Sequence, residues 1–116
     1  MDYYNRKGEP VTQEEWAERY MWEDIRVKLT EFEEQGIRVS TIWLGIDQAW
    51  GDMPAPLIFE TMVFMDQELS EDDPLQYWDE FCARYPTEEV AVAEHVKIVA
   101  TIQRIIDNQE PKAIEK

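Results

Sequence analysis

Two apolar segments joined by a polar loop constrain the fold of this chain more than any other feature of its sequence. The segment VSTIWLGI, residues 39–46, is rich in the β-branched and aromatic residues that favour strands. Beyond Ser40 it is apolar on both alternations, which is typical of a strand covered on both sides. The segment PLIFETMVFM, residues 56–65, has the same character. We therefore expect two neighbouring strands, with the first in the middle of a sheet.

Shorter patterns predict further strands. Residues 3–11 predict a short strand, a turn and a returning strand. Residues 25–30 alternate apolar and polar side chains, which predicts a strand with one solvent-exposed face, and residues 33–36 form a turn that ends in glycine. Residues 74–85 fit a helical turn that begins at Pro74 and leads into a strand near Phe81–Tyr85.

Two helices have clear sequence signals. Thr12 and Glu15 form a capping-box pattern, so the first helix is predicted from Gln13 to about Glu23. The last helix follows Thr87, a favourable N-cap residue. Its predicted core-facing stripe consists of Val92, Val96, Val99, Ile102 and Ile106.

Together these elements predict an α+β fold. We expect an antiparallel sheet of about four strands with an N-terminal helix and a long C-terminal helix packed on it. At 116 residues the chain is expected to form a single domain, over residues 1–108. The polar segment 109–116 contains a proline and is expected to fray as a C-terminal tail.

The charge of the chain is strongly negative and unevenly distributed. The sequence has 26 acidic and 11 basic residues, for a formal net charge of −15. Such a surface repels nucleic acid and anionic membranes and favours basic partners. No Lys or Arg occurs between Arg38 and Arg84, whereas ten Asp or Glu residues do. Two interpretations of this segment stay open: a surface that only provides solubility, and an electrostatic docking face.

Two loops supply the candidate residues of that docking face. In the loop 47–56, Trp50 lies between Asp47 and Asp52. An exposed tryptophan among polar groups is typical of an interface anchor; the alternative is that the loop folds Trp50 back over the sheet edge. The charged loop 66–74 supplies four further carboxylates, which are Glu68, Glu71, Asp72 and Asp73.

Glu60 and His95 are the polar residues that we expect in the core. Glu60 interrupts the apolar segment 56–65, and His95, the only histidine, falls within the apolar stripe of the last helix. A buried polar side chain needs a hydrogen-bond partner. A Glu60–His95 pair between helix and sheet would provide one, and Arg84 or a tyrosine hydroxyl is the alternative partner for Glu60. We interpret such a pair as structural, with a general acid–base pair as the alternative.

The sequence contains no motif for a metal, a cofactor or covalent catalysis. One histidine with scattered carboxylates is a poor zinc set, and the acidic loop lacks the EF-hand register. We therefore expect neither metal nor cofactor. Cys82, the only cysteine, excludes an internal disulfide and is expected as a small buried thiol in a reducing compartment. No signal-peptide pattern and no membrane-length apolar run is present, so we expect a cytoplasmic protein without membrane association.

Several blocks carry most of the distinctive character of the sequence. They are Tyr3-Tyr4 with Gly8, VTQEEW, VSTIWLGID, PLIFETMVF, and Arg84-Tyr85 followed by TEEVAVAEH. From residue 3 to about residue 99 this pattern resembles a family of small acidic proteins encoded by bacteriophages and prophages. That family has His where this chain has Gln48, and a glycine-rich stretch where this chain has MDQELSEDD. The resemblance implies a phage or prophage origin and a strand at Arg84-Tyr85, but no activity, because the family has none assigned.

These observations predict a non-enzymatic binding protein in the cytoplasm of a bacterial host. It would dock on a basic surface of a host protein, and a surface meant for DNA would make it an inhibitor of the anti-defence or DNA-mimic type. One alternative is a structural protein that assembles as a homo-oligomer, such as a homodimer formed through an exposed sheet edge. The other is a small enzyme that uses His95 and Glu60.

Overall fold

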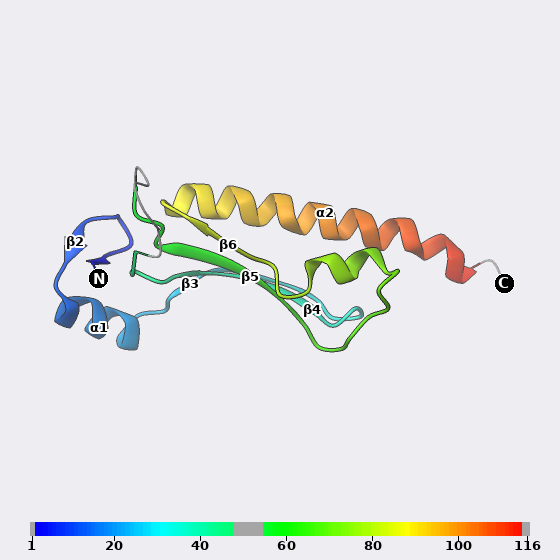
Figure 1. Ribbon diagram of the computed structural model, residues 1–116, viewed down its shortest axis with the longest axis horizontal. Helices are drawn as coiled ribbons and strands as arrows, with labels where there is room; N and C mark the ends of the chain where they lie inside the picture. The colour runs from blue at the N-terminus through cyan, green and yellow to red at the C-terminus, as the bar shows by residue number, and fades with distance from the viewer. Residues whose placement is uncertain (1, 48–54, 115–116) are drawn as a thin grey trace.

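The computed structural model describes residues 2–47 and 55–114, which form an α+β fold (Figure 1). Its antiparallel sheet has the strand order β3-β4-β5-β6, and α2 runs along one face of that sheet. A second, two-stranded sheet and α1 lie at one end, and the short 3-10 helix η1 lies towards the other. The predicted four-stranded sheet with an N-terminal helix and a long C-terminal helix is confirmed. The elements are β1 (Tyr3–Tyr4), β2 (Pro10–Val11), α1 (Gln13–Trp22), β3 (Arg26–Phe32), β4 (Ile37–Trp43), β5 (Phe59–Met65), η1 (Pro74–Trp78), β6 (Cys82–Tyr85) and α2 (Glu88–Ile114).

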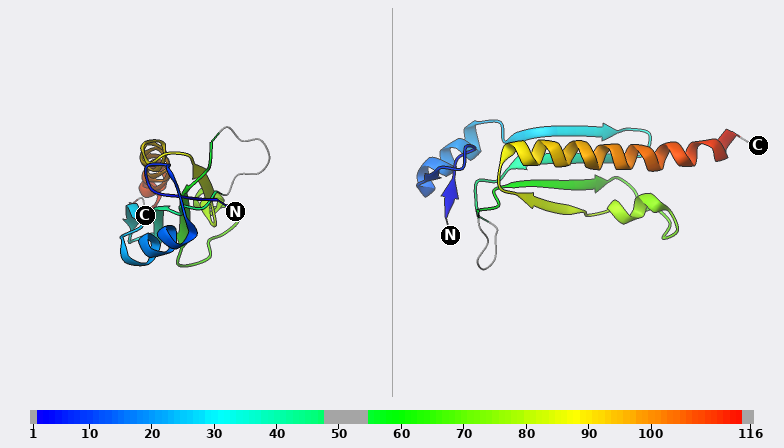
Figure 2. Two further views of the ribbon diagram at one scale, coloured as in Figure 1. Left: turned by 90° about the vertical axis from the view of Figure 1, so that its left-hand side faces the viewer. Right: turned by 90° about the horizontal axis from the view of Figure 1, so that it is seen from above.

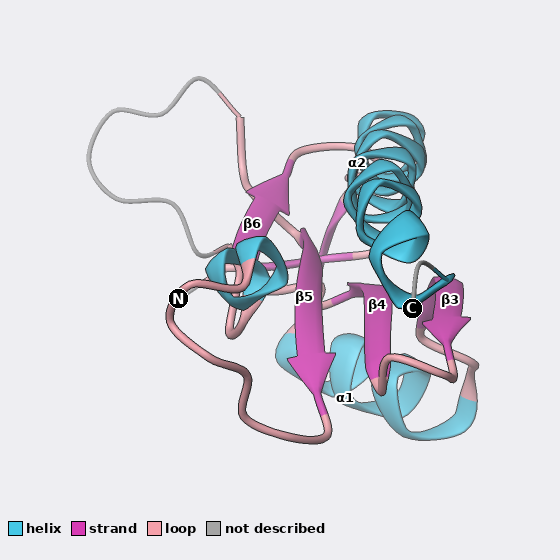
Figure 3. Cartoon of the chain, turned by 90° about the vertical axis from the view of Figure 1, so that its right-hand side faces the viewer, coloured by secondary structure: helices cyan, strands magenta, loops and turns pink. Residues whose placement is uncertain are grey.

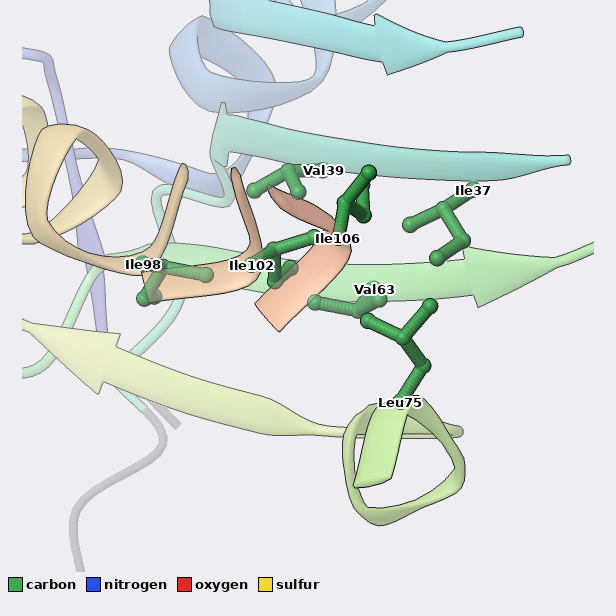
Figure 4. Packing of buried hydrophobic residues seen from close by; sticks show 7 residues of the cluster. All are labelled: Ile37, Val39, Val63, Leu75, Ile98, Ile102 and Ile106. Carbon is green, nitrogen blue, oxygen red and sulfur yellow. The ribbon is translucent and has the colours of Figure 1, made fainter. Parts of the chain in front are cut away.

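The core lies between α2 and the sheet. β4 and β5 pair without a break from Ile37 opposite Met65 to Trp43 opposite Phe59, so their side chains alternate in step. Figure 4 shows one buried cluster of seven aliphatic side chains from β4, β5, η1 and α2. Burial of each such side chain contributes about 1.5–3 kcal/mol, which makes this layer the main stabilising contact. The seven are Ile37, Val39, Val63, Leu75, Ile98, Ile102 and Ile106.

The opposite face of the sheet is largely open. The predicted interior position of β4 is confirmed, but the prediction that both of its faces are covered is wrong. On the open face Arg38 is exposed, Ile42 is half-buried, and Phe64 of β5 is 38% exposed. The Arg38 guanidinium lies 5.1 Å from the Phe64 ring centre and shields part of it. A single long helix covers one face, and α1 lies at the end of the sheet rather than across the second face (Figures 1 and 2).

A β-bulge in β3 changes which residues of that strand face α2. Arg26 pairs with Ile42 and Lys28 with the adjacent Thr41, so Val27 is an extra residue. The alternation is inverted beyond it: Leu29 is 39% exposed on the open face, and Thr30 points towards α2. The sequence predicted the reverse for these two residues.

The buried face of α2 is also rotated from the predicted stripe. Thr87 caps the helix, as expected, by accepting a hydrogen bond from the Val90 amide. Val96, placed in the predicted stripe, is 52% exposed. The buried positions are Ala91, His95, Ile98, Ile102 and Ile106.

The C-terminal part of α2 passes beyond the predicted domain boundary. The helix continues to Ile114, so it runs through most of the segment 109–116 that was predicted as a frayed tail. The Gln109 side chain donates a hydrogen bond to Asp73, which connects this part of the helix to η1.

The N-terminal segment packs through aromatic rings against the end of the sheet. The predicted capping box of Thr12 and Glu15 is confirmed at the start of α1. The Trp16 indole N–H donates to the Leu44 carbonyl at 2.8 Å. Gly45 has φ +72, and a Cβ there would lie within 2.6 Å of both the Trp16 and Trp43 indoles, so only glycine fits.

Candidate functional site

An acidic loop follows β5 and continues through η1 to the start of β6. Figure 3 shows this segment on the β6 side of the sheet, on the far side of β5 from β3. Glu68, Glu71 and Asp72 are exposed, as the docking hypothesis requires. No hydrogen bond or ion pair within the described part of the chain engages these three carboxylates. They are therefore available to a partner.

Asp73 has a structural role instead. It caps η1 by accepting a hydrogen bond from the Leu75 amide at 2.9 Å. Its carboxylate also accepts one from the Gln109 side chain at 3.0 Å, and the residue is half-buried. Asp73 thus joins η1 to α2, and its carboxylate is engaged within the chain.

An exposed tyrosine lies within this acidic segment. The Tyr77 side chain is 77% exposed, and its ring contacts Trp78 edge-on at 5.5 Å. The Trp78 ring in turn lies 5.0 Å from the Phe81 ring, and both pack against the core. The exposed Tyr77 ring therefore rests on side chains that the core holds in place. Tyr77 is not among the docking residues predicted from the sequence. The signal was present, because Leu75 and Trp78 share one side of the helical turn and leave Tyr77 on the other.

The chain leaves η1 through a strained residue. Glu80 has φ +62 and is the one non-glycine residue with positive φ within residues 2–47 and 55–114. This conformation costs a non-glycine residue roughly 1–2 kcal/mol. Glu80 is exposed and lies three residues after Tyr77. We call the exposed side chains of Glu68, Glu71, Asp72, Tyr77 and Glu80 the acidic loop surface.

The other predicted part of the docking face is the loop 47–56. Trp50 and Asp52 fall outside the described residues. Asp47 is described, and its carboxylate accepts a hydrogen bond from the Leu57 amide at 3.3 Å. β5 separates Asp47 from Glu68, and its seven residues extend for about 23 Å. Asp47 and the acidic loop surface therefore lie at opposite ends of β5 and cannot form one continuous patch.

His95 is fully buried between α2 and the sheet, where hydroxyl groups satisfy both ring nitrogens. Thr41 Oγ1 lies 2.7 Å from Nδ1, and Thr30 Oγ1 lies 2.8 Å from Nε2. Thr41 also hydrogen bonds to Thr61, which interacts with the Tyr85 hydroxyl. Burial, together with the Lys28 charge, lowers the pKa of His95, so the ring is neutral. One residue from each strand of the sheet joins this chain of hydrogen bonds.

Glu60 lies on the opposite face of the sheet, so the predicted pair with His95 is not formed. Thr61 faces α2, and side chains alternate along a strand, which directs Glu60 to the face that α2 does not cover, where Glu60 is nevertheless buried. There its Oε2 accepts a hydrogen bond from Arg84 Nε at 3.1 Å. Arg84 was one of the two alternative partners predicted for Glu60, beside a tyrosine hydroxyl, and the structure shows the pair with Arg84.

Cys82 shares this open face and is exposed, so the prediction of a buried thiol is wrong. It lies on the edge strand β6, on the face that α2 does not cover. The Cys82 thiol donates a hydrogen bond to Glu60 Oε2 at 3.3 Å. Partial burial and the Glu60 carboxylate raise the pKa of the Cys82 thiol, which keeps it protonated at neutral pH.

Residues 2–47 and 55–114 contain neither a metal-binding cluster nor a membrane-length apolar helix. No cluster of three or more His, Cys, Asp or Glu side chains there could hold a metal ion. No helix in the same part of the chain is long and apolar enough to cross a membrane. Comparisons with family models, with curated proteins and with solved structures found no match to this chain.

Proposed function

We propose that this chain is a phage-derived binding protein that docks its acidic loop surface on a basic surface of a bacterial host protein. The observation that carries the proposal is the Tyr77 side chain, which is 77% exposed and packs on Trp78. It lies among carboxylates that have no partner within the described residues. Exposed tyrosines surrounded by polar side chains are frequent binding hot spots. The resemblance to small acidic phage proteins supports the host-cell setting.

The two kinds of side chain contribute differently to binding. Carboxylates at the rim of an interface attract a basic partner over a distance and raise the association rate. They are screened by salt, since the Debye length falls from about 30 Å at 0.01 M to about 8 Å at 0.15 M. The Tyr77 ring acts at contact range by filling a pocket, which slows dissociation. Charge and ring can therefore be tested separately.

A surface that normally binds DNA is the most suitable basic target. It carries lysines and arginines spaced for phosphates, and DNA presents one charge per about 1.7 Å of helix axis. Carboxylates on a fixed loop can occupy such a surface without any base-specific contact. Inhibition of a host DNA-binding protein follows if the loop and the DNA compete for that surface. We do not propose an enzyme, because Glu60 and His95 lie on opposite faces of the sheet.

The first experiment captures the partner. The full chain is immobilised, exposed to bacterial lysate at low salt, and washed at high salt, and the eluted proteins are identified by mass spectrometry. We expect one basic protein that is retained at low salt, released at high salt, and displaced by duplex DNA. If no protein behaves in this way, the proposal is wrong.

Variants then show whether the acidic loop surface makes the contact. The variant Glu68→Gln, Glu71→Gln, Asp72→Asn should lower the association rate and flatten its salt dependence. Tyr77→Ala should leave the association rate nearly unchanged and raise the dissociation rate about 30-fold or more, equivalent to about 2 kcal/mol. A matched control, Glu14→Gln, Glu18→Gln, Glu89→Gln, removes three exposed charges elsewhere and should bind like the wild type. Equal effects of the control and the loop variant would reject the loop as the docking site.

A further inference from the structure

The strand β3 forms an open edge of the four-stranded sheet. Among the described residues it pairs only with β4, so its outer N–H and C=O groups have no strand partner. The right-hand view of Figure 2 shows β3 as the outermost strand on one side, with η1 beside β6 on the other side. The bulge at Val27 affects only the beginning of the strand, and Lys28 to Phe32 pair regularly with β4. A regular open edge of this kind can accept another strand.

A groove runs beside this edge, between β3 and the flank of α2. It encloses about 290 Å³, and most of its wall is apolar. Val96 is 52% exposed there, which is unusual for a valine in a long core-facing helix. The groove has room for a few apolar side chains of a partner that adds a strand at this edge. Its lining includes Lys28, Thr30, Val96, Val99, Ala100 and Gln103.

The charges along β3 identify the occupant. The first half of the strand carries Arg26 and Lys28, and its end carries Glu31. Glu33 and Glu34 follow in the turn, and Asp24, which precedes the strand, lies 3.7 Å from Arg26 in an ion pair. All six side chains are exposed. An antiparallel copy of the same strand reverses this order, so its acidic half meets the basic half of the first copy. An unrelated basic partner would fit the acidic half and be repelled by the other. The edge is therefore complementary to itself.

We propose that two copies of the chain form a two-fold symmetric dimer through antiparallel β3 strands, with the α2 helices side by side over the two grooves. A two-fold axis near Leu29 continues the sheet across both subunits. Arg26 and Glu31 both project on the open face, given their pairing with Ile42 and Arg38, so each Arg26 lies beside the partner's Glu31. This inference does not rest on the proposed function, because the acidic loop surface lies on the β6 side (Figure 3).

The molar mass of the purified full chain is the first test. Sedimentation equilibrium from micromolar to submillimolar concentration should show a shift from one to two chain masses. The dissociation constant of the dimer should rise with salt, because the contacts between Arg26 and Glu31 are screened. A chain that remains monomeric over the whole range overturns the proposal.

Charge reversal tests the arrangement of the two strands. The variant Arg26→Glu, Lys28→Glu makes the edge acidic along its length, and the variant Glu31→Lys, Glu33→Lys makes it predominantly basic. In each variant alone, like charges meet and the dissociation constant should rise at least about tenfold. An equimolar mixture should form heterodimers, because each edge now complements the other. Dimers that survive both reversals, or folded variants that fail to combine in the mixture, overturn the antiparallel β3 interface.

Two controls separate this interface from general effects of charge and folding. Glu14→Lys, Glu18→Lys on α1 changes the net charge as much as the basic β3 variant and should leave the dimer intact. Val96→Arg should weaken the dimer and leave the monomer folded, because Val96 is exposed in the monomer. Tryptophan fluorescence confirms folding of each variant. A control that dissociates the dimer, or a dimer unaffected by Val96→Arg, contradicts the arrangement.

Discussion

Lowering the pH should weaken the fold through His95, because the structure buries this ring in its neutral form. The threonine hydroxyls at 2.7 and 2.8 Å satisfy both ring nitrogens, and burial, followed by the Lys28 charge, lowers its pKa from the usual 6.5. In the unfolded chain, the pKa of His95 returns to its usual value. Between the two pKa values the unfolded state binds more protons than the folded state, so stability is lost as the pH falls below about 6.5.

The upper limit of this loss of stability follows from the pKa of His95 in the unfolded chain alone. If the His95 ring stays neutral in the folded protein, moving from pH 7.5 to pH 5.5 lowers the free energy of unfolding by about 1.4 kcal/mol. This is roughly a tenfold change in the folding equilibrium, against a total of about 5–15 kcal/mol for a typical domain. The acidic surface acts in the opposite direction, because protonation of carboxylates relieves their mutual repulsion. A variant is needed to separate the two effects.

The assay is urea unfolding at pH 7.5 and pH 5.5, followed by tryptophan fluorescence, for the wild type and for His95→Gln. Gln keeps hydrogen-bonding groups but does not titrate, so it separates the effect of the His95 proton. Because Gln cannot reproduce the packing and both hydrogen bonds of the buried ring, we expect the variant to be about 1–3 kcal/mol less stable at pH 7.5. The carboxylate contribution is common to both proteins and cancels in the difference between them. The wild type should lose up to about 1.4 kcal/mol more than the variant on acidification. Equal losses in the two proteins would refute the assignment of a buried neutral histidine.

Four other substitutions test local features of the fold. Gly45→Ala places a methyl group within 2.6 Å of two indoles at φ +72, and should cost about 3 kcal/mol or more in urea unfolding. Gly8→Ala at φ +85 meets nothing within 4 Å and should cost only about 1 kcal/mol, so equal costs would contradict the packing argument. Glu80→Gly should raise the unfolding free energy by about 0.5–1 kcal/mol, and a decrease would show that φ +62 is not a strained conformation there. Cys82 should react slowly with a thiol reagent at pH 7.5 and faster in Glu60→Gln, since the Glu60 carboxylate raises the pKa of the thiol; unchanged rates would remove that cause.

Local signals were sufficient to predict most of the element boundaries. The capping box at Thr12 and Glu15 is a property of four consecutive residues, so it could be recognised without knowledge of the rest of the fold. The same holds for Thr87 at the start of α2 and for Pro74 at the start of η1. These signals depend on the chain near one position, and the sequence contains that information directly.

The partners of buried polar residues could not be predicted in the same way. Whether Glu60 meets His95 or Arg84 depends on which face of β5 the helix α2 covers, and alternation alone allows either. The bulge at Val27 arises from the pairing of β3 with β4 and inverts the faces of Leu29 and Thr30. Such features follow from non-local pairing, which a local pattern of apolar residues does not contain.

The candidate site was predicted in part. Charge alone identified Glu68, Glu71 and Asp72, which are exposed, but it also selected Asp73, whose carboxylate caps η1 and accepts from Gln109. An N-cap aspartate before Leu75 could have been recognised from the Asp-Pro sequence. The contact with Gln109 could not, because it joins residues 36 positions apart.

The two proposed surfaces make a joint prediction, because they lie on opposite sides of each subunit. Pairing through β3 leaves β6, η1 and the acidic loop surface at the outer ends of the combined sheet (Figure 2). A dimer would then present two such surfaces, and a partner with two basic sites that both surfaces can reach would be held more tightly through avidity. Val96→Arg, which leaves the acidic loop surface unchanged, should retain the wild-type association rate at one isolated site and lose apparent affinity only for the two-site partner. Loss of binding to a single isolated site in this variant would show instead that the groove itself takes part in docking.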